Sequence, residues 1–219
     1  MRFTLIIYDD IIIIIKGGLD MSKLIFNYSA MNSGKTMDLI RTAYNYYENN
    51  LNVLILKPGV DTKGGDYIKT RIGLSRRVDI IVKENDSIIN LLKDKTENIS
   101  LILVDEAQFL SEKQVKELFI FSNVCDIPVI CYGLRTNFKG KLFNGIKALL
   151  ALADELNKLK TLCSCGNIAR FNARKLNDEY VTSGDEVVID GSSEYRYEPL
   201  CSKCFTEKIL SKNKTLIKR

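Results

Sequence analysis

The 219-residue sequence contains no histidine and no tryptophan, and it has only three prolines. Without histidine, the chain can have neither an imidazole acid or base in catalysis nor a histidine-ligated metal. It also lacks a membrane-spanning run of about 20 apolar residues, because Asp9 and Asp10 interrupt the apolar stretch near the N-terminus. We therefore expect a cytoplasmic protein with no membrane span, no signal peptide and no membrane partner. The net charge of +5 is a mild excess that suits phosphorylated ligands without requiring nucleic acid.

The first twenty residues differ in character from the rest of the chain. The tripeptide Lys16-Gly17-Gly18 stands a few residues before Met21. A purine-rich ribosome-binding site that is translated in frame encodes Lys-Gly-Gly. We predict that Met21 is the natural start and that residues 1–20 are a non-native N-terminal extension. Peptides from residues 2–15, found in protein made from the native locus, would refute this.

Apolar strand-like runs alternate with amphipathic helix-like runs over residues 21–158, which indicates an α/β fold built on a parallel sheet. The predicted strands are 23–28, 53–57, 78–82, 100–105 and 128–134. The predicted helices are 35–48, 87–93, 112–122 and 145–153. Residues 59–77 are rich in Gly, Asp and Lys and predict a long functional loop. Beyond residue 158 we expect short ribbon strands within 161–175 and 180–197, and residues 206–219 predict a basic tail.

The most informative motif lies between the first predicted strand and the first predicted helix. A strand, a tight loop and Gly-Lys-Thr at a helix start are typical of a phosphate-binding P-loop. The N–H groups of a helix N-terminus and the helix dipole both favour an anion there. Ser29 replaces the glycine that usually begins the pattern, and the alternative is an ordinary turn with a solvated lysine. The predicted phosphate-binding residues are Ser29, Ala30, Met31, Asn32, Ser33, Gly34, Lys35 and Thr36.

A second nucleotide motif ends the predicted strand 100–105. Asp105 and Glu106 follow a buried apolar run, so they would face the crevice at the carboxyl edge of a parallel sheet. In P-loop enzymes such an Asp helps to hold Mg²⁺, as does the hydroxyl of the Gly-Lys-Thr threonine, here Thr36. Glu106 would then handle a proton. The alternative is two solvated acids at a strand end.

Four of the six cysteines form two close pairs, separated by residues 166–200. Four thiolates satisfy tetrahedral Zn²⁺, and a closed site of four protein ligands is structural rather than catalytic. Disulfides are the competing interpretation, which a cytoplasmic location argues against. We predict a zinc-stapled β-ribbon domain over residues 159–205. Its metal ligands are Cys163, Cys165, Cys201 and Cys204.

These motifs together resemble one family, the thymidine kinases of the cytosolic, zinc-containing type. The resemblance extends from about Met21 to about Phe205 and implies a P-loop (RecA-like) sheet with helices on both faces, followed by the zinc-stapled domain, called a lasso. The matching blocks are Ser-Ala-Met-Asn-Ser-Gly-Lys-Thr at 29–36, Thr-Arg-Ile-Gly-Leu-Ser at 70–75, Val-Asp-Glu-Ala-Gln-Phe at 104–109, Cys-Tyr-Gly-Leu-Arg-Thr-Asn-Phe at 131–138, Glu-Val-Val-Ile at 186–189 and Tyr-Glu-Pro-Leu-Cys at 197–201.

The resemblance implies transfer of the ATP γ-phosphoryl group to the 5′-hydroxyl of thymidine, and it leaves open deoxyuridine as an alternative acceptor. Glu106 resembles the general base, and Lys35, Thr36 and Asp105 would handle the phosphates and Mg²⁺. Asp61 matches an acid near the reacting groups, and Arg71 would steady its loop or remain a solvated charge. A homotetramer inhibited by thymidine triphosphate is also implied by the family.

Recognition of thymine is assigned by the same resemblance. The backbone groups of Val187, Val188 and Ile189 in the lasso would read the edge of the base. An aromatic residue would pack on the nucleoside, and spacing to the last cysteine pair favours Tyr197 over Tyr195. Further residues that match the thymine pocket, each with plain core packing as the alternative, are Met31, Phe109 and Phe138.

A P-loop ATPase with a zinc ribbon that acts on nucleic acid is the rival hypothesis. Residues 105–108 resemble a helicase acidic box, and zinc ribbons often contact nucleic acid. Against it, a single α/β domain is small for a two-domain motor, and the Arg and aromatic stripes of a strand channel are missing. A non-catalytic zinc-ribbon module would leave Lys35 and Glu106 unexplained.

Overall fold

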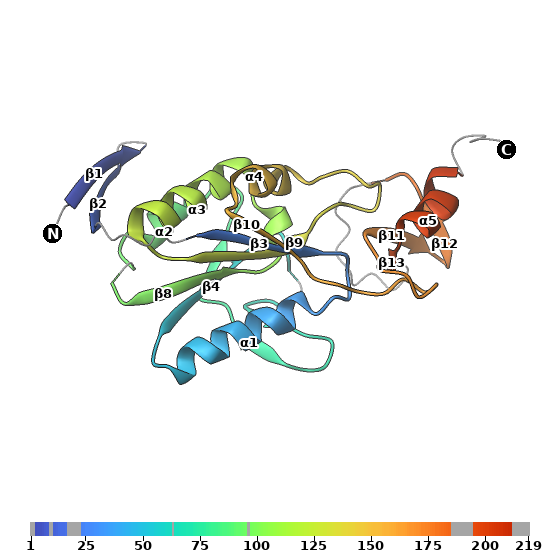
Figure 1. Ribbon diagram of the computed structural model, residues 1–219, viewed down its shortest axis with the longest axis horizontal. Helices are drawn as coiled ribbons and strands as arrows, with labels where there is room; N and C mark the ends of the chain where they lie inside the picture. The colour runs from blue at the N-terminus through green and yellow to red at the C-terminus, as the bar shows by residue number, and fades with distance from the viewer. Residues whose placement is uncertain are drawn as a thin grey trace.

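The computed structural model describes residues 3–8, 11–16, 23–62, 64–95, 97–184 and 195–211. A six-stranded parallel sheet forms the centre of the molecule (Figure 1). From edge to edge its strands are β10 (Glu155–Lys158), β3 (Leu24–Ser29), β9 (Val129–Leu134), β8 (Ile99–Val104), β4 (Asn52–Pro58) and β7 (Ile80–Val82). Because every pairing is parallel, the loops after β3, β4 and β8 all leave from one edge, and the candidate site lies there.

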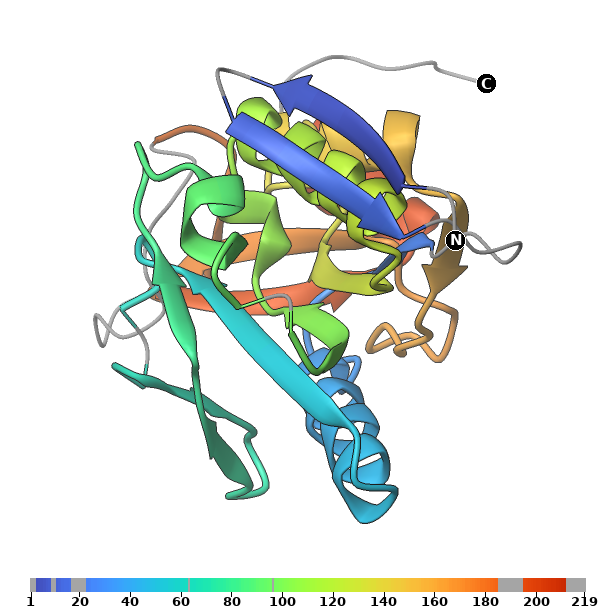
Figure 2. The same ribbon diagram turned by 90° about the vertical axis from the view of Figure 1, so that its left-hand side faces the viewer.

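Helices cover both faces of this sheet (Figures 1 and 2). Helix α1 (Lys35–Glu48) lies on one face, where Leu39 packs with Leu101 and Leu103 of β8. The intervening residues of β8, Ile102 and Val104, belong to the core on the opposite face. That face carries α2 (Ile88–Leu92), α3 (Glu112–Cys125) and α4 (Asn144–Leu152). Burial on both faces explains why these strands are almost continuously apolar in sequence.

A smaller unit follows the sheet domain, and we call residues 159–184 and 195–211 the cysteine unit. Its three-stranded antiparallel sheet has β11 (Phe171–Leu176) between β12 (Glu179–Val181) and β13 (Tyr195–Leu200). A short helix, α5 (Ser202–Phe205), and a helical turn, η2 (Thr206–Leu210), close it. Ile209 is buried in its core, so the unit continues past residue 205 into the predicted tail.

The predicted fold class is confirmed, and the structure adds elements that the sequence did not predict. The loop after β4 contains a two-stranded ribbon of β5 (Tyr67–Lys69) and β6 (Ser75–Arg77). A 3-10 turn, η1 (Ala107–Phe109), follows β8. The backbone of β1 (Phe3–Tyr8) and β2 (Ile11–Lys16) forms a hairpin beside α3. The predicted start, Met21, and residues 212–219 of the predicted tail lie outside the described residues.

Candidate functional site

The predicted phosphate-binding residues form a tight loop between β3 and α1. Two of them have left-handed backbone, Asn32 with φ 62° and Gly34 with φ 81°. A side chain at Gly34 would be strained by that φ, and its Cβ would lie 3.4 Å from Met37 Cε. Helix α1 begins directly after this turn. The N–H groups of the first turn of a helix have no partner within the helix. The loop therefore has the local geometry of an anion site at a helix N-terminus.

Lys35, the first residue of α1, is buried beneath this loop. Its Nζ donates hydrogen bonds to Ser29 Oγ at 3.1 Å and to the Ala30 carbonyl at 3.2 Å. Burial lowers the pKa of Lys35, while the charges of Glu106 and Asp105 oppose that shift. The loop therefore surrounds a largely desolvated ammonium group. An anion bound in the loop would offset the cost of burying that charge.

Asp105 lies directly across from α1. Its Oδ2 accepts a hydrogen bond from Thr36 Oγ1 at 3.1 Å, and its side chain is almost fully buried. Burial, followed by the charge of Glu106, raises the pKa of Asp105 to about 7. A divalent cation beside Thr36 and Asp105 would relieve this repulsion, because carboxylate and hydroxyl oxygens are the ligands that Mg²⁺ uses.

Glu106 is held in place by a neighbour that the sequence analysis did not assign. Glu106 has left-handed backbone, with φ 50°, and its carboxylate accepts a hydrogen bond from Gln108 Nε2. Gln108 Oε1 accepts the N–H of Leu134 at 2.9 Å. A Cβ on Gly133 would lie 3.0 Å from that same Oε1, so the glycine leaves room for Gln108. In the sequence, Gln108 stood out only as part of the motif blocks 104–109 and 105–108, with no role of its own.

A cavity of about 480 Å³ opens beside these groups. It is lined by residues 31–36 of the phosphate loop and by Asp105, Glu106, Asp61 and Arg71, whereas Ser29 and Ala30 are buried beside it. Asp61 Oδ2 lies 2.9 Å from Nζ of Lys57, a lysine at the end of β4 with only 1% of its side chain exposed. Lys57 was not among the predicted site residues, because a lysine near the end of an apolar strand does not show by itself which side chain it meets after folding. The structure therefore brings the predicted phosphate loop and three predicted acids into one space.

The aromatic residues predicted for the thymine pocket lie outside this cavity. Phe138 is fully buried, and the guanidinium carbon of Arg174 lies 3.7 Å from its ring centroid. Phe109 packs edge to face with Phe143 at 6.0 Å between centroids. Tyr195 and Tyr197 are two positions apart in β13, so their side chains lie on the same face of the strand. The guanidinium carbon of Arg174 lies 5.2 Å from the centroid of the Tyr195 ring. The predicted base-reading residues Val187, Val188 and Ile189 lie outside the described residues.

The four predicted metal-ligating cysteines converge at the far end of the cysteine unit. The Sγ atoms of Cys163, Cys165, Cys201 and Cys204 all lie within 4.8 Å of one another, and none of the four is in a disulfide. Hydrogen bonds from Asn167 lower the pKa of Cys165 to about 6. Hydrogen bonding to the other cysteines, Cys165 first, raises that of Cys204 to about 12. Four soft donors at this spacing could hold a tetrahedral metal ion, which would favour all four as thiolates.

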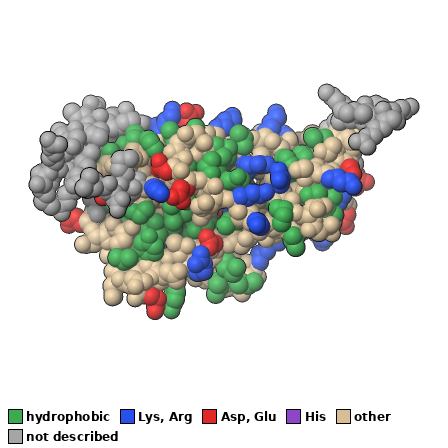
Figure 3. Space-filling view, in the orientation of Figure 1, with side chains coloured by type: hydrophobic (Ala, Val, Ile, Leu, Met, Phe, Trp, Pro, Cys, Tyr) green, Lys and Arg blue, Asp and Glu red, His purple; other side chains and the backbone are tan. Residues whose placement is uncertain are grey.

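Basic side chains gather where the sheet domain meets the cysteine unit, on the face shown in Figure 3. Burial lowers the pKa of Lys158, and the nearby cations Arg170, Arg135 and Lys160 lower it further. The clustering indicates a positive potential at the junction of the two units. Such a potential attracts anionic ligands towards a site at the sheet edge.

Taken together, these groups suit phosphoryl transfer. A loop of N–H donors and a buried lysine would bind a polyphosphate, and Thr36 with Asp105 would hold its metal ion. Glu106 is partly buried in the same cavity, where it could accept a proton from an attacking hydroxyl.

Among the described residues, no helix combines the length and the apolar character needed to cross a bilayer.

Comparison with known proteins gives a consistent family. The family model described as "Thymidine kinase" matches residues 22–205. A thymidine kinase of Rhodopirellula baltica is 42% identical over 196 residues, covering 86% of this chain and 90% of that protein. That of Pasteurella multocida is 42% identical over 193 residues, covering 86% and 99%. That of Enterobacteria phage T4 is 41% identical over 191 residues, covering 85% and 97%.

Solved structures show a more distant likeness. The Pif1 helicase of Candida albicans aligns with a TM-score of 0.40 and 11% identity over 64% of this chain. A Bacteroides Pif1 bound to single-stranded DNA aligns with a TM-score of 0.34 and 11% identity over 63% of it. This chain spans just over a third of each helicase, 36% and 38%.

Proposed function

The chain belongs to the thymidine kinase family and is a kinase of thymidine, and we propose that it transfers the γ-phosphoryl group of ATP to the thymidine 5′-hydroxyl. The products would be dTMP and ADP, and deoxyuridine would be a second acceptor. The observation that supports this most is the convergence of Lys35, Thr36, Asp105 and Glu106 at one edge of the sheet. These are the groups that phosphoryl transfer requires: phosphate ligands, metal ligands and a base.

In this proposal the loop of residues 29–36 binds the ATP phosphates. Its backbone N–H groups and Lys35 would neutralise the polyphosphate, and Mg²⁺ would be held by Thr36 and Asp105. Since phosphoryl transfer depends mainly on positioning and charge neutralisation, this loop supplies most of the chemistry. Thr36 and Asp105 would hold Mg²⁺ there, and the ion would supply positive charge that offsets the charge of the phosphates.

Glu106 is proposed as the base that accepts the proton of the 5′-hydroxyl. Gln108 fixes one of its carboxylate oxygens and leaves the other for the substrate. The nucleoside would lie against Met31, Asp61, Phe109, Phe138 and the aromatic Tyr197. The backbone of Val187, Val188 and Ile189 would read the thymine edge. Backbone groups cannot change rotamer, so the readout would be rigid, and a base that leaves a donor or acceptor unmatched would lose about 1–3 kcal/mol.

Structural Zn²⁺ is proposed as the ion of the four-cysteine cluster. Cys163, Cys165, Cys201 and Cys204 offer only sulfur ligands and leave no open position for chemistry. The ion would hold the segment before β11 to the segment after β13, the two ends of the loop between the cysteine pairs. Free thiols of this kind suit a reducing cytoplasm, where we place the enzyme. A homotetramer inhibited by thymidine triphosphate completes the proposal.

ATP consumption separates this proposal from its rival. The purified chain with Mg²⁺ should release ADP when thymidine is added, and not with single-stranded DNA or with neither. Turnover stimulated by single-stranded DNA alone would instead support a nucleic-acid ATPase.

Replacing Lys35 with Met should separate stability from nucleotide binding. We expect ATP affinity to fall at least about tenfold, because the loop loses its phosphate cation. The free energy of unfolding of the ligand-free protein should not fall, since the variant removes a buried charge whose pKa is lowered by desolvation. Nucleotide titration and thermal unfolding measure the two effects. Unchanged ATP affinity would remove Lys35 from the site.

The raised pKa of Asp105 predicts a pH dependence of metal–nucleotide binding. Mg²⁺ needs the carboxylate, so affinity for Mg·ATP should rise about tenfold from pH 6 to pH 8, with proton release.

The stability of the ligand-free protein should have the opposite dependence on pH. A carboxyl whose folded pKa is near 7 binds a proton that the unfolded chain has released, so stability falls as pH rises from about 4 to 7. Asp105→Asn should abolish both dependences, and a variant that keeps them would contradict the assignment.

A further inference from the structure

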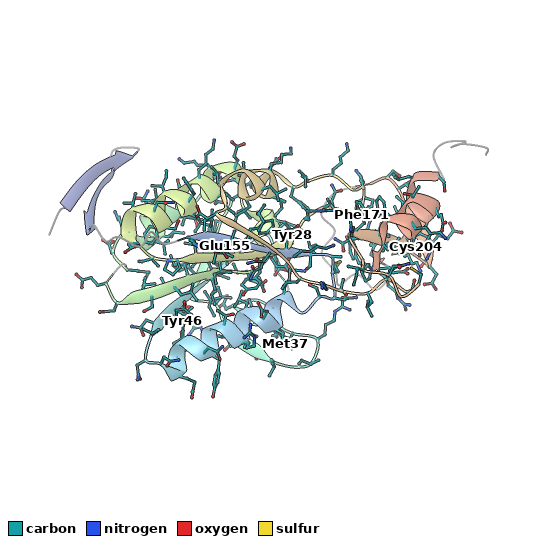
Figure 4. The ribbon with its side chains drawn as sticks, viewed as in Figure 1. Tyr28, Met37, Tyr46, Glu155, Phe171 and Cys204 are labelled. Carbon is teal, nitrogen blue, oxygen red and sulfur yellow. The ribbon has the colours of Figure 1, made fainter. Side chains whose placement is uncertain are left out.

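One buried side chain connects the cysteine unit to the phosphate loop. Asn172 in β11 is 2% exposed, and its Oδ1 accepts the backbone N–H of Met31 at 2.7 Å. Its Nδ2 donates to the carbonyl of Thr136, in the segment after β9, at 3.2 Å. A single amide therefore joins the phosphate loop, the sheet domain and the cysteine unit. Figure 4 labels Phe171, the residue before Asn172, on the side of the cysteine unit that faces the central sheet.

The residues on either side of Met31 are also held by the cysteine unit. Ala30 is 2% exposed and belongs to the same hydrophobic cluster as Cys163, Cys201 and other core residues of that unit. The carbonyl of Asn32 accepts a hydrogen bond from Thr161 Oγ1 at 3.1 Å. Three consecutive loop residues thus have their positions set by a unit that follows them by some 130 residues or more.

These contacts bear on the conformation of the loop. Residues 30–34 belong to neither β3 nor α1, and Asn32 has an uncommon left-handed backbone. A loop without such anchors would have to be ordered when its ligand binds, at a cost in conformational entropy. An anchor at Met31 fixes the turn before ATP arrives. The N–H groups that follow it, at the start of α1, would then be held ready to bind the phosphates.

We propose that Asn172 is a positioning residue for ATP: it holds the phosphate loop in its binding conformation, so that the cysteine unit supports the binding of both substrates. This rests on the proposed function, in which that loop binds ATP. Asn172 touches neither the phosphates nor the reacting oxygen, and it acts through the Met31 backbone. The position has no recognisable motif in the sequence, and its role follows from the contacts alone.

The test compares Asn172→Leu and Asn172→Ala with Thr161→Val. The last variant removes the neighbouring hydrogen bond from Thr161 to the Asn32 carbonyl. We expect KM for ATP to rise about tenfold in the two Asn172 variants and about twofold to threefold in Thr161→Val. KM for thymidine should rise by less than KM for ATP, since Met31 also borders the proposed nucleoside site, and the zinc content should stay at the wild-type value. Glu179→Gln is the matched control, because it changes an exposed residue of β12 and should leave every value unchanged. Affinity for ADP, measured by titration without thymidine, gives a second readout and should fall in parallel.

The outcomes separate the inference from the proposed function. Wild-type protein that shows no thymidine-dependent ATP turnover would refute the function itself. A functional wild type with unchanged KM for ATP in the folded Asn172 variants would refute the positioning role alone. An equal rise in KM for ATP and for thymidine would mean that Asn172 supports the structure of the cysteine unit as a whole rather than the phosphate loop. That result would also overturn the proposal. If both Asn172 variants fail to fold, the test passes to Thr161→Val. A raised KM for ATP in that variant would support anchoring of the phosphate loop by the cysteine unit, and an unchanged KM would contradict it.

Discussion

Replacing Glu106 with Gln is expected to lower kcat by about 10²- to 10⁴-fold, the usual contribution of one well-placed base. Gln keeps the size of the side chain and can still bond Gln108, but it cannot accept the proton of the 5′-hydroxyl. KM for thymidine and affinity for ATP should therefore change little. Steady-state kinetics with both substrates varied measure the split between kcat and KM.

The matched control for this variant is Glu112→Gln. Glu112 undergoes the same chemical change at the exposed start of α3, where it pairs with Lys116. Its kcat should equal that of the wild type. A wild-type kcat in Glu106→Gln would show that Glu106 is not the base, and that positioning by the phosphate loop accounts for the rate.

Replacing Cys201 with Ser should cost the protein its metal and most of its activity. Cys201 belongs to the four-cysteine cluster, and its Sγ lies 3.6 Å from Cys165 Sγ. Structural zinc contributes about 10–16 kcal/mol of binding free energy in small zinc domains, and the cysteine unit has only a small core of its own. We expect bound zinc to fall from one ion per chain to almost none, and thymidine phosphorylation to fall at least about 100-fold. Elemental analysis and kinetics measure the two losses.

Cys125→Ser is the matched control for this experiment. Cys125 is half-buried at the end of α3, away from the cluster, and burial raises the pKa of its thiol to about 11. It should retain zinc and activity. If Cys201→Ser keeps both as well, the cluster does not hold a structural ion, and the lasso is stable without one.

The parts of the fold that could be predicted are those with a local signal. Strand β8 is apolar except for Ser100 because both of its faces are buried, so sequence alone places it within a residue or two. The edge strand β10 has Glu, Asn and Lys among its four residues and gave no such pattern. The ribbon of β5 and β6 consists of strands of three residues, too short for a period to appear.

The same distinction holds for the site. Lys35, Thr36, Asp105 and Glu106 could be predicted because each stands at the end of a strand or the start of a helix, where parallel topology brings such positions together. Lys57 and Gln108 could not be assigned, since their roles depend on which side chains they meet after folding. The contact between Asn172 and the phosphate loop joins residues 141 positions apart, and no sequence period reports it.

Transfer of a labelled γ-phosphoryl group would demonstrate the proposed reaction itself. The purified chain is incubated with Mg²⁺, thymidine and ATP labelled in its γ-phosphate, and the products are separated. We expect the label on the 5′-oxygen of thymidine, in equal amount to the ADP formed. Thymidine recovered unlabelled, or label released only as inorganic phosphate, would contradict it.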